Sequence, residues 1–245
     1  MKAKAVSVVG FKDSGKTRVV EALVTELTAR GYSIASIKHT AEDVPLDTPG
    51  KDTWRHRQAG AKASAILHNK GSAIFLEKAL TPYYATAMLG EHDYLILEGF
   101  KQLETVPRII VPKTQGDIEK LSNGLEITIA NPDSVKGKPE ELADIVEEKA
   151  FPLLSGLNCR GCGYDGCRDL AKAILHGDAG IQNCVVHFSG LGLKVNGKNV
   201  KLNKFTSDIL RNVVKGVLGS LKGVEVHKIV ELVMDYEYTA SHMYI

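Results

Sequence analysis

The first residues whose types and spacing could do chemistry form the segment Gly10–Thr17, which matches G-x-x-x-x-G-K-[ST]. A short apolar run precedes it and a helical pattern over residues 16–30 follows, which is the context that a phosphate-binding loop requires. Glycines let successive N–H groups turn toward phosphate oxygens, and the helix N-terminus adds about half a positive charge. Lys16 is expected to reach the β- and γ-phosphates, and the Thr17 hydroxyl is expected to bind Mg²⁺. The residues predicted to bind nucleotide are Gly10, Phe11, Lys12, Asp13, Ser14, Gly15, Lys16 and Thr17.

A carboxylate should complete the magnesium site, because Mg²⁺ in nucleotide sites is usually held by one or two carboxylates. The apolar run Tyr94–Glu98 is typical of a buried central strand, and ligands gather at the carboxyl ends of parallel strands. Glu98 ends this run and is predicted to be catalytic together with Lys16 and Thr17; the alternative is a surface residue that ends a strand. Lys38 and His39 end another expected strand and could flank the phosphates, although a lone histidine is often structural.

All four cysteines lie in one short segment, with the spacing Cys159-x2-Cys162-x4-Cys167-x16-Cys184. In a reducing compartment such clustering favours metal ligation over disulfides. Four thiolates suit an iron–sulfur cluster, and they also suit structural zinc. Zinc sites usually pair two Cys-x2-Cys units, and only one is present here. Iron–sulfur ligation is the preferred prediction, with zinc and plain buried cysteines as the alternatives.

The elements that must position these residues alternate between strand and helix, which predicts an α/β fold with a mostly parallel sheet. Expected strands include Ser33–His39, Ser64–His68, Ser72–Leu76, Arg108–Val111 and Glu126–Ala130, and expected helices include Asp52–Ala59, Ala79–Leu89 and Pro139–Ala150. We predict a nucleotide-binding domain over residues 1–150, a four-cysteine domain over 151–188 that opens with a linker at Phe151–Asn158, and a small α+β unit over 189–245. This last unit should contain an Asn196-Gly197 hairpin turn, a helix at Thr206–Leu221 and a strand at Val226–Met234.

The composition excludes several classes of protein. The formal net charge is +2, so the molecule as a whole is not built to bind nucleic acid. No apolar stretch approaches the roughly 20 residues that span a bilayer, and the N-terminal apolar run is too short for a signal peptide. A soluble cytoplasmic protein is expected.

Five motifs in order resemble the MobB family of molybdopterin-guanine dinucleotide biosynthesis adaptor proteins. They are Gly10–Thr17, Ile37-Lys38-His39, Asp47–Asp52, Arg55–Ala61 and Leu97–Lys101, and the resemblance covers about residues 4–135. It implies a GTP-binding P-loop protein with weak GTPase activity, a homodimer, that assists the guanylyltransferase joining GMP to molybdopterin. Position by position, it gives Lys16, Thr17 and Glu98 the roles above and makes Asp47, Gly50, Lys51 and Asp52 a mobile loop near the nucleotide or the pterin phosphate.

Two features depart from that pattern or leave it open. Many members carry a His-Asp pair soon after the Lys-His pair, where this chain reads Thr40-Ala41-Glu42-Asp43. No Asn-Lys-x-Asp guanine-reading motif is present, because Asn69-Lys70-Gly71-Ser72 lacks the Asp. A preference for GTP over ATP therefore depends on the resemblance alone.

The cysteine segment resembles the small [4Fe-4S] domain of RnfB-type subunits and corrinoid iron–sulfur proteins over about residues 158–187. Cys162-Gly163-Tyr164-Asp165-Gly166-Cys167 and His176-Gly177-Asp178 carry this likeness. The resulting hypothesis is a P-loop NTPase fold followed by a [4Fe-4S] module, an accessory protein in molybdenum or tungsten cofactor assembly whose cluster docks on or senses a client enzyme. The alternatives are an iron–sulfur electron-transfer protein driven or gated by nucleotide hydrolysis, and an adaptor without catalysis.

Overall fold

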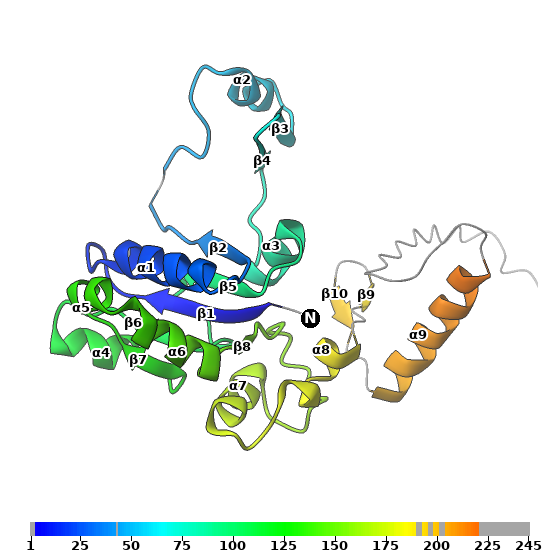
Figure 1. Ribbon diagram of the computed structural model, residues 1–245. Coiled ribbons are helices and arrows are strands. Elements are labelled where there is room, and N and C mark those ends of the chain that lie inside the picture. The colour runs from blue at the N-terminus through cyan, green and yellow to red at the C-terminus, as the bar shows by residue number, and fades with distance from the viewer. Residues whose placement is uncertain (1–2, 43, 190–192, 196–197, 201–203, 221–245) are drawn as a thin grey trace, which may run out of the picture.

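The computed structural model describes residues 3–42, 44–189, 193–195, 198–200 and 204–220. Its main sheet is mostly parallel, in the order β2-β5-β1-β6-β7 (Figure 1). The strands are β1 (Lys4–Val9), β2 (Ile34–Lys38), β5 (Tyr94–Glu98), β6 (Arg108–Ile110) and β7 (Glu126–Ile129). Lys38 and Val8 both pair with Glu98 in register, so the carboxyl ends of these three strands meet at one edge. The predicted α/β fold with a parallel sheet is confirmed.

Helices cover both faces of this sheet. Helix α1 (Lys16–Ala29), α5 (Pro132–Gly137) and α6 (Pro139–Lys149) share one buried core with the sheet, and α1 contributes Val19, Leu23 and Leu27 at helical spacing. On the other face, Leu121 of α4 (Gln115–Leu121) packs with Val9 and Ile110. The predicted apolar stripe of α1 is confirmed, whereas α4 and α5 had no counterpart in the sequence analysis.

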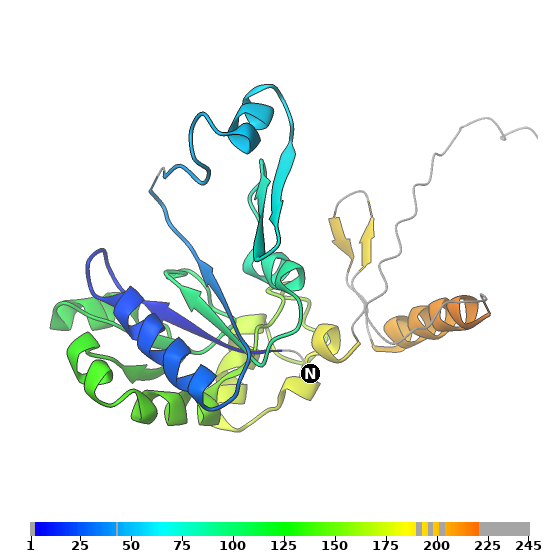
Figure 2. The same cartoon turned by 45° about the horizontal axis from the view of Figure 1, so that its top comes forward.

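An arm rises from the sheet between β2 and β5. It consists of the loop over residues 44–51, α2 (Asp52–Gln58) and the antiparallel hairpin of β3 (Ala63–His68) and β4 (Gly71–Leu76), and both views show it standing away from the main sheet (Figures 1 and 2). Helix α3 (Pro82–Leu89) then leads back to β5. It starts later than the expected Ala79, because Thr81 caps it by accepting a hydrogen bond from the Tyr84 amide and Pro82 fits the first helical turn.

The expected linker at Phe151–Asn158 is wrong over its first half. Phe151 and Pro152 form β8, which pairs antiparallel with Lys4 and Ala5 of β1. Phe151, Leu153 and Leu154 are buried, since such an apolar run gains more from packing than from exposure. The chain continues through α7 (Cys167–His176), a 3-10 turn at Ile181–Asn183 and α8 (Val185–Ser189), and Leu125, the residue before β7, joins their core.

Short elements follow toward the C-terminus. β9 (Leu193–Val195) and β10 (Lys198–Val200) pair antiparallel, and α9 (Lys204–Gly219) confirms the expected helix. The predicted turn at 196–197 and strand at 226–234 lie outside the described residues. Within the described part of the chain, no helix has both the length and the apolar character needed to cross a membrane.

Candidate functional site

The loop Gly10–Gly15 joins the end of β1 to the start of α1, and its glycines are required by close packing. Gly15 has φ +86°, and a Cβ built on it would lie 2.4 Å from Cγ of Pro132. A Cβ on Gly10 would lie 2.5 Å from the carbonyl oxygen of Val111. Asp13 also has a positive φ of 57°, so the backbone curls tightly above the helix N-terminus. Ser14 is buried, and among the described residues its hydroxyl has no hydrogen-bond partner.

Thr17 and Glu98 lie together at the carboxyl edge of the sheet. The Thr17 hydroxyl donates a hydrogen bond of 2.9 Å to Glu98 Oε1, and Lys38 Nζ lies 3.3 Å from the same oxygen. Glu98 is 8% exposed, so its carboxylate is largely shielded from water. A hydroxyl and a carboxylate are oxygen ligands of the kind that Mg²⁺ takes. The two side chains predicted to hold magnesium are therefore adjacent and fit that ion.

Lys16 folds back over its own loop. Its Nζ donates a hydrogen bond of 2.6 Å to the carbonyl oxygen of Phe11. Burial lowers the pKa of Lys16; nearby Glu98 opposes this shift, while Lys101 and Lys38 add to it. A phosphate would give this ammonium a charged acceptor in place of a neutral carbonyl.

Two lysines beside the loop were missed as site residues. Lys101 Nζ lies 4.8 Å from the centre of the Phe11 ring, and Lys113 Nζ lies 3.5 Å from the carbonyl oxygen of Lys12. Lys101 stood within the last of the five motifs, which was a usable signal. Lys113 lies just before a short helix, α4, that the sequence periodicity did not reveal.

His39 acts on the site through its backbone in this structure. Its amide donates to the Glu98 carbonyl oxygen at 2.9 Å, and its ring lies 5.2 Å from the Phe100 ring. Gly99 has φ +91°, and a Cβ there would lie 2.7 Å from the His39 carbonyl oxygen. These contacts fix the turn that carries Glu98. A direct role of the His39 side chain with phosphate stays a prediction.

The residues of the expected mobile loop lie on the arm. Asp47 forms an ion pair with Arg57 at 3.0 Å, Gly50 has φ +83°, Lys51 precedes α2 and Asp52 begins it. In the described part of the chain, their hydrogen bonds and ion pairs stay within the arm. The structure thus does not bring them to the phosphate loop, and their role with nucleotide stays a prediction.

The four cysteines are free thiols, and three of them, Cys162, Cys167 and Cys184, belong to one small hydrophobic core. Cys167 and Cys184 are buried with Leu154 and Leu170, whereas Cys159 and Cys162 are partly exposed. Burial raises the pKa of Cys167 and of Cys184, backbone hydrogen bonds oppose this shift, and neighbouring cysteines add to it. Sulfur is a soft ligand suited to iron–sulfur clusters and zinc.

Backbone amides point at the buried sulfurs, as cluster ligands require. The Asn158 amide donates to Cys167 Sγ at 3.4 Å, and Asn158 Oδ1 accepts a hydrogen bond of 2.8 Å from the Cys167 amide. Backbone amides of Val186 and His187 likewise donate to Cys184. The donor set therefore fits a cluster. No group of three His, Cys, Asp or Glu side chains among the described residues is already arranged at coordination distances, so ligation would need the thiols to draw together.

Comparison with known proteins identifies both parts of the chain. The family model described as "Molybdopterin guanine dinucleotide synthesis protein B" matches residues 5–130, and the model described as "Putative Fe-S cluster" matches residues 154–186. A protein of Methanocaldococcus jannaschii named "Putative molybdopterin-guanine dinucleotide biosynthesis adapter protein" is 30% identical over 95% of this chain and 97% of its own length.

Other matches cover the N-terminal part. The molybdopterin-guanine dinucleotide biosynthesis adapter protein of Haemophilus influenzae is 32% identical over 45% of this chain and 64% of its own length. The crystal structure of Bacillus subtilis MobB is 27% identical, with a TM-score of 0.46, over 51% of this chain and 78% of its own. Because one family model covers the phosphate loop and the sheet around it, and one relative matches nearly end to end, this chain belongs to the molybdopterin guanine dinucleotide synthesis protein B family.

Proposed function

We propose that this protein binds GTP with Mg²⁺ at the phosphate loop and serves as an accessory protein when GMP is joined to molybdopterin. The observation that carries the nucleotide part is the contact of Thr17 with Glu98 at 2.9 Å beside the curled loop. The biosynthetic part rests on the family and on the relatives' names. The partners would be a guanylyltransferase and molybdopterin, in the cytoplasm, with a homodimer as the working form.

The chain's own residues would act mainly by positioning. The loop amides would cradle the phosphates, and Lys16 would leave the Phe11 carbonyl to pair with β- and γ-phosphate oxygens. Thr17 and Glu98 would hold Mg²⁺, which supplies charge neutralisation on the phosphates when bound. Hydrolysis is expected to be slow, because nothing in the sequence marks an arginine finger. Arg55 or Arg57 of the arm could serve across a dimer.

Nucleotide binding is tested by titrating GTP and ATP into the wild type and the Lys16→Ala variant, each with Mg²⁺ and with EDTA. The proposal expects tighter binding of GTP than of ATP and a large loss on Lys16→Ala. Lys136→Ala, which removes an exposed lysine of α5, is the matched control. Unchanged GTP affinity in Lys16→Ala would refute nucleotide binding at this loop. Co-purification with a nucleotidyltransferase tests the partner separately.

The four-cysteine segment is proposed to hold a [4Fe-4S] cluster that docks on, or senses the redox state of, a molybdenum or tungsten enzyme. Its support is the four cysteines, the amide donors to Cys167 and Cys184, and the matching family model. Anaerobic purification followed by iron, sulfide and zinc analysis tests it. Zinc without sulfide would replace this proposal with a structural zinc site.

A second candidate function is electron transfer gated by nucleotide hydrolysis. It is favoured by the direct contact of Arg168, the residue after Cys167, with Glu104 of the nucleotide-binding part at 3.0 Å. GTPase rates measured with and without reductant separate the two candidates. A rate that rises only on reduction would favour this second function.

A further inference from the structure

A polar cavity of about 310 Å³ lies between the sheet and α7, beside the phosphate loop. Its volume falls in the range of small-molecule sites. Its wall is made by residues far apart in sequence: Phe11, Lys101, Glu104, Arg108, Asn123 and Arg168. The residues proposed above to hold phosphate and Mg²⁺, Lys16, Thr17 and Glu98, do not line it, and neither do the cysteines.

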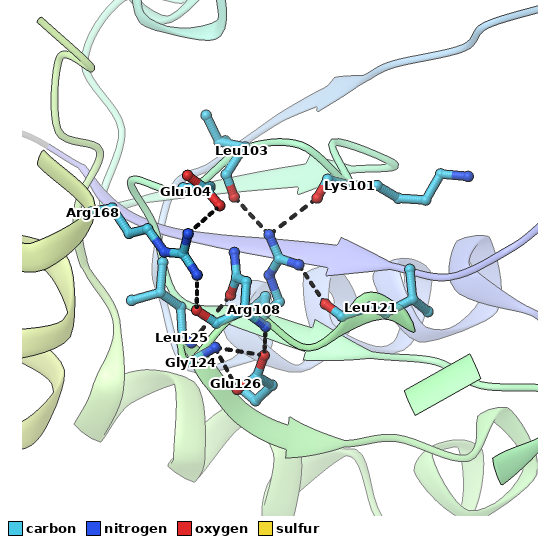
Figure 3. Close-up of polar contacts among 10 residues, drawn as sticks. Lys101, Leu103, Glu104, Arg108, Leu121, Gly124, Leu125, Glu126 and Arg168 are labelled. Atoms are coloured by element: carbon cyan, nitrogen blue, oxygen red, sulfur yellow. Dashed lines mark hydrogen bonds and ion pairs between the residues drawn. The ribbon is translucent and has the colours of Figure 1, made fainter. Parts of the chain in front are cut away.

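Arg108 is the most deeply buried part of this wall, at 1% exposure. Figure 3 shows its guanidinium between two stretches of backbone, donating to the carbonyl oxygens of Lys101 and Leu103 on one side and of Leu121 on the other. These bonds give each terminal nitrogen at least one acceptor. Among the described residues, Arg108 Nε has no acceptor. A purely structural role for Arg108 explains its bonds to the three carbonyl oxygens, but it does not explain why Nε lacks an acceptor.

Two further donors in the same wall lack acceptors. Arg168 reaches in from α7 and pairs with Glu104 at 3.0 Å (Figure 3). It also donates to the Asn123 carbonyl oxygen at 3.1 Å. Asn123 Oδ1 accepts from the Leu125 amide at 3.1 Å. Arg168 Nε and Asn123 Nδ2 are buried and unpaired within the described parts of the chain. Buried polar groups are normally hydrogen-bonded, and these three atoms have almost no accessible surface. A ligand rich in acceptors could satisfy these donors only if their side chains turn toward the cavity.

The charge of the wall selects an anion. Lys101, Lys120, Arg108 and Arg168 line the cavity, against the single carboxylate of Glu104, so the wall carries an excess of positive charge. Arginine forks match phosphate oxygens, and a phosphate offers more acceptors than a carboxylate. The space exceeds what one oxyanion would fill, so an organic group should accompany the phosphate.

We propose that this cavity binds a small phosphate monoester, and that Arg108, Asn123 and Arg168 turn their shielded donors toward its phosphate oxygens when it binds. The cavity shares Phe11 with the phosphate loop, but Lys16, Thr17 and Glu98 do not line it, so the proposal does not depend on nucleotide binding at the loop. Its ligand would touch both the sheet and the first turn of α7.

The test uses the full chain carrying Lys16→Ala, so that the phosphate loop is weakened as a competing site. Phenyl phosphate is titrated by calorimetry, with inorganic phosphate and benzoate as comparison probes. Asn123→Asp keeps the acceptor that Leu125 uses and replaces the unpaired donor with a carboxylate oxygen. Asn69→Asp, in the exposed turn between β3 and β4, makes the same charge change elsewhere and is the matched control.

One phenyl phosphate per chain is expected, with affinity lowered about tenfold or more by Asn123→Asp and little changed by Asn69→Asp, because a bond to a charged group is lost and repulsion is added. Lys120→Gln, an exposed change that should leave the fold intact, is expected to weaken binding severalfold. Equal affinities in the two Asn variants, or no binding in the Lys16→Ala background, would overturn the site. Benzoate binding as tightly would overturn the phosphate assignment, and inorganic phosphate binding as tightly would overturn the monoester. GTP titration into the wild type reports separately on the phosphate loop.

Discussion

Replacing Gly15 with alanine should destabilise the phosphate loop through a steric clash. A matched variant allows the effect of this clash to be measured separately from that of backbone strain. Gly15 has φ +86°, and Gly31, at the other end of α1, has φ +90°. A Cβ on Gly15 would lie 2.4 Å from Cγ and 3.0 Å from Cβ of Pro132, whereas a Cβ on Gly31 would meet nothing within 4 Å. Gly31→Ala therefore carries the same backbone cost without the steric clash.

The left-handed conformation costs an alanine roughly 1–2 kcal/mol, and the reduced freedom of the unfolded chain offsets roughly 0.4–1 kcal/mol of this. Gly31→Ala should then lower the free energy of unfolding by about 1 kcal/mol. Gly15→Ala adds overpacking against Pro132, typically about 1–3 kcal/mol. With a urea m-value of about 2 kcal/mol/M, a difference of about 2 kcal/mol separates the two unfolding midpoints by about 1 M.

The assay is urea unfolding without nucleotide, because a bound ligand would itself raise the apparent stability. GTP affinity is measured in parallel and should fall for Gly15→Ala alone. Pro132→Ala removes the nearer atom, so the double variant with Gly15→Ala should recover part of the lost stability. Equal urea midpoints for Gly15→Ala and Gly31→Ala would show that Pro132 does not clash with a Cβ at position 15, and would refute this reasoning.

Three other changes test the site and the core. Glu98→Gln should lower GTP affinity about tenfold in Mg²⁺ and leave it unchanged in EDTA, by calorimetry; an equal loss in both would exclude Glu98 from the magnesium site. Burial, with Tyr32 nearby, raises the pKa of Tyr94 to about 12, so stability should be full below pH 10 and fall as the pH rises toward 12; Tyr94→Phe should flatten that fall in alkaline urea titrations, and parallel curves would contradict it. Cys184→Ser should strongly lower the iron bound per chain after anaerobic purification while GTP binding persists, and full iron retention would remove Cys184 from the ligand set.

The parts of the fold that the sequence predicts well are those with a local signature. β1, the phosphate loop and α1 follow from an apolar run, a glycine motif and a 3.6-residue stripe, and β5 follows from its apolar run. The proximity of Thr17 and Glu98 was also predictable, because parallel strands end at one edge.

Two short helices were not predicted, because an apolar periodicity can be recognised only over a longer segment. α4 and α5 have seven and six residues, too few to show a stripe. Their caps were nevertheless visible: Thr114 and Asp117 form a capping box, and Asn131 precedes a proline. Cap signals would have found both helices.

Arg108 could not have been recognised, because its role depends on tertiary closure. In sequence it is one cation before two isoleucines, at the start of an expected strand. Its acceptors come from the loop after β5 and from the end of α4, which meet only when the sheet is formed. The sequence alone does not distinguish an exposed arginine from a buried arginine that donates to backbone carbonyl oxygens, because the segments that carry those oxygens are distant in sequence.

The first turn of α7 connects the cysteines physically to the phosphate loop. Cys167 begins the helix, and the next residue, Arg168, pairs with Glu104. Glu104 shares a loop with Lys101, whose ammonium lies over the ring of Phe11. Any ligand that fixes Cys167 also fixes where Arg168 can reach, and any anion that engages Arg168 competes with Glu104 for it. A ligand at the cysteines and an anion in the cavity would therefore both act on the Arg168 guanidinium, which lies in the wall of the cavity.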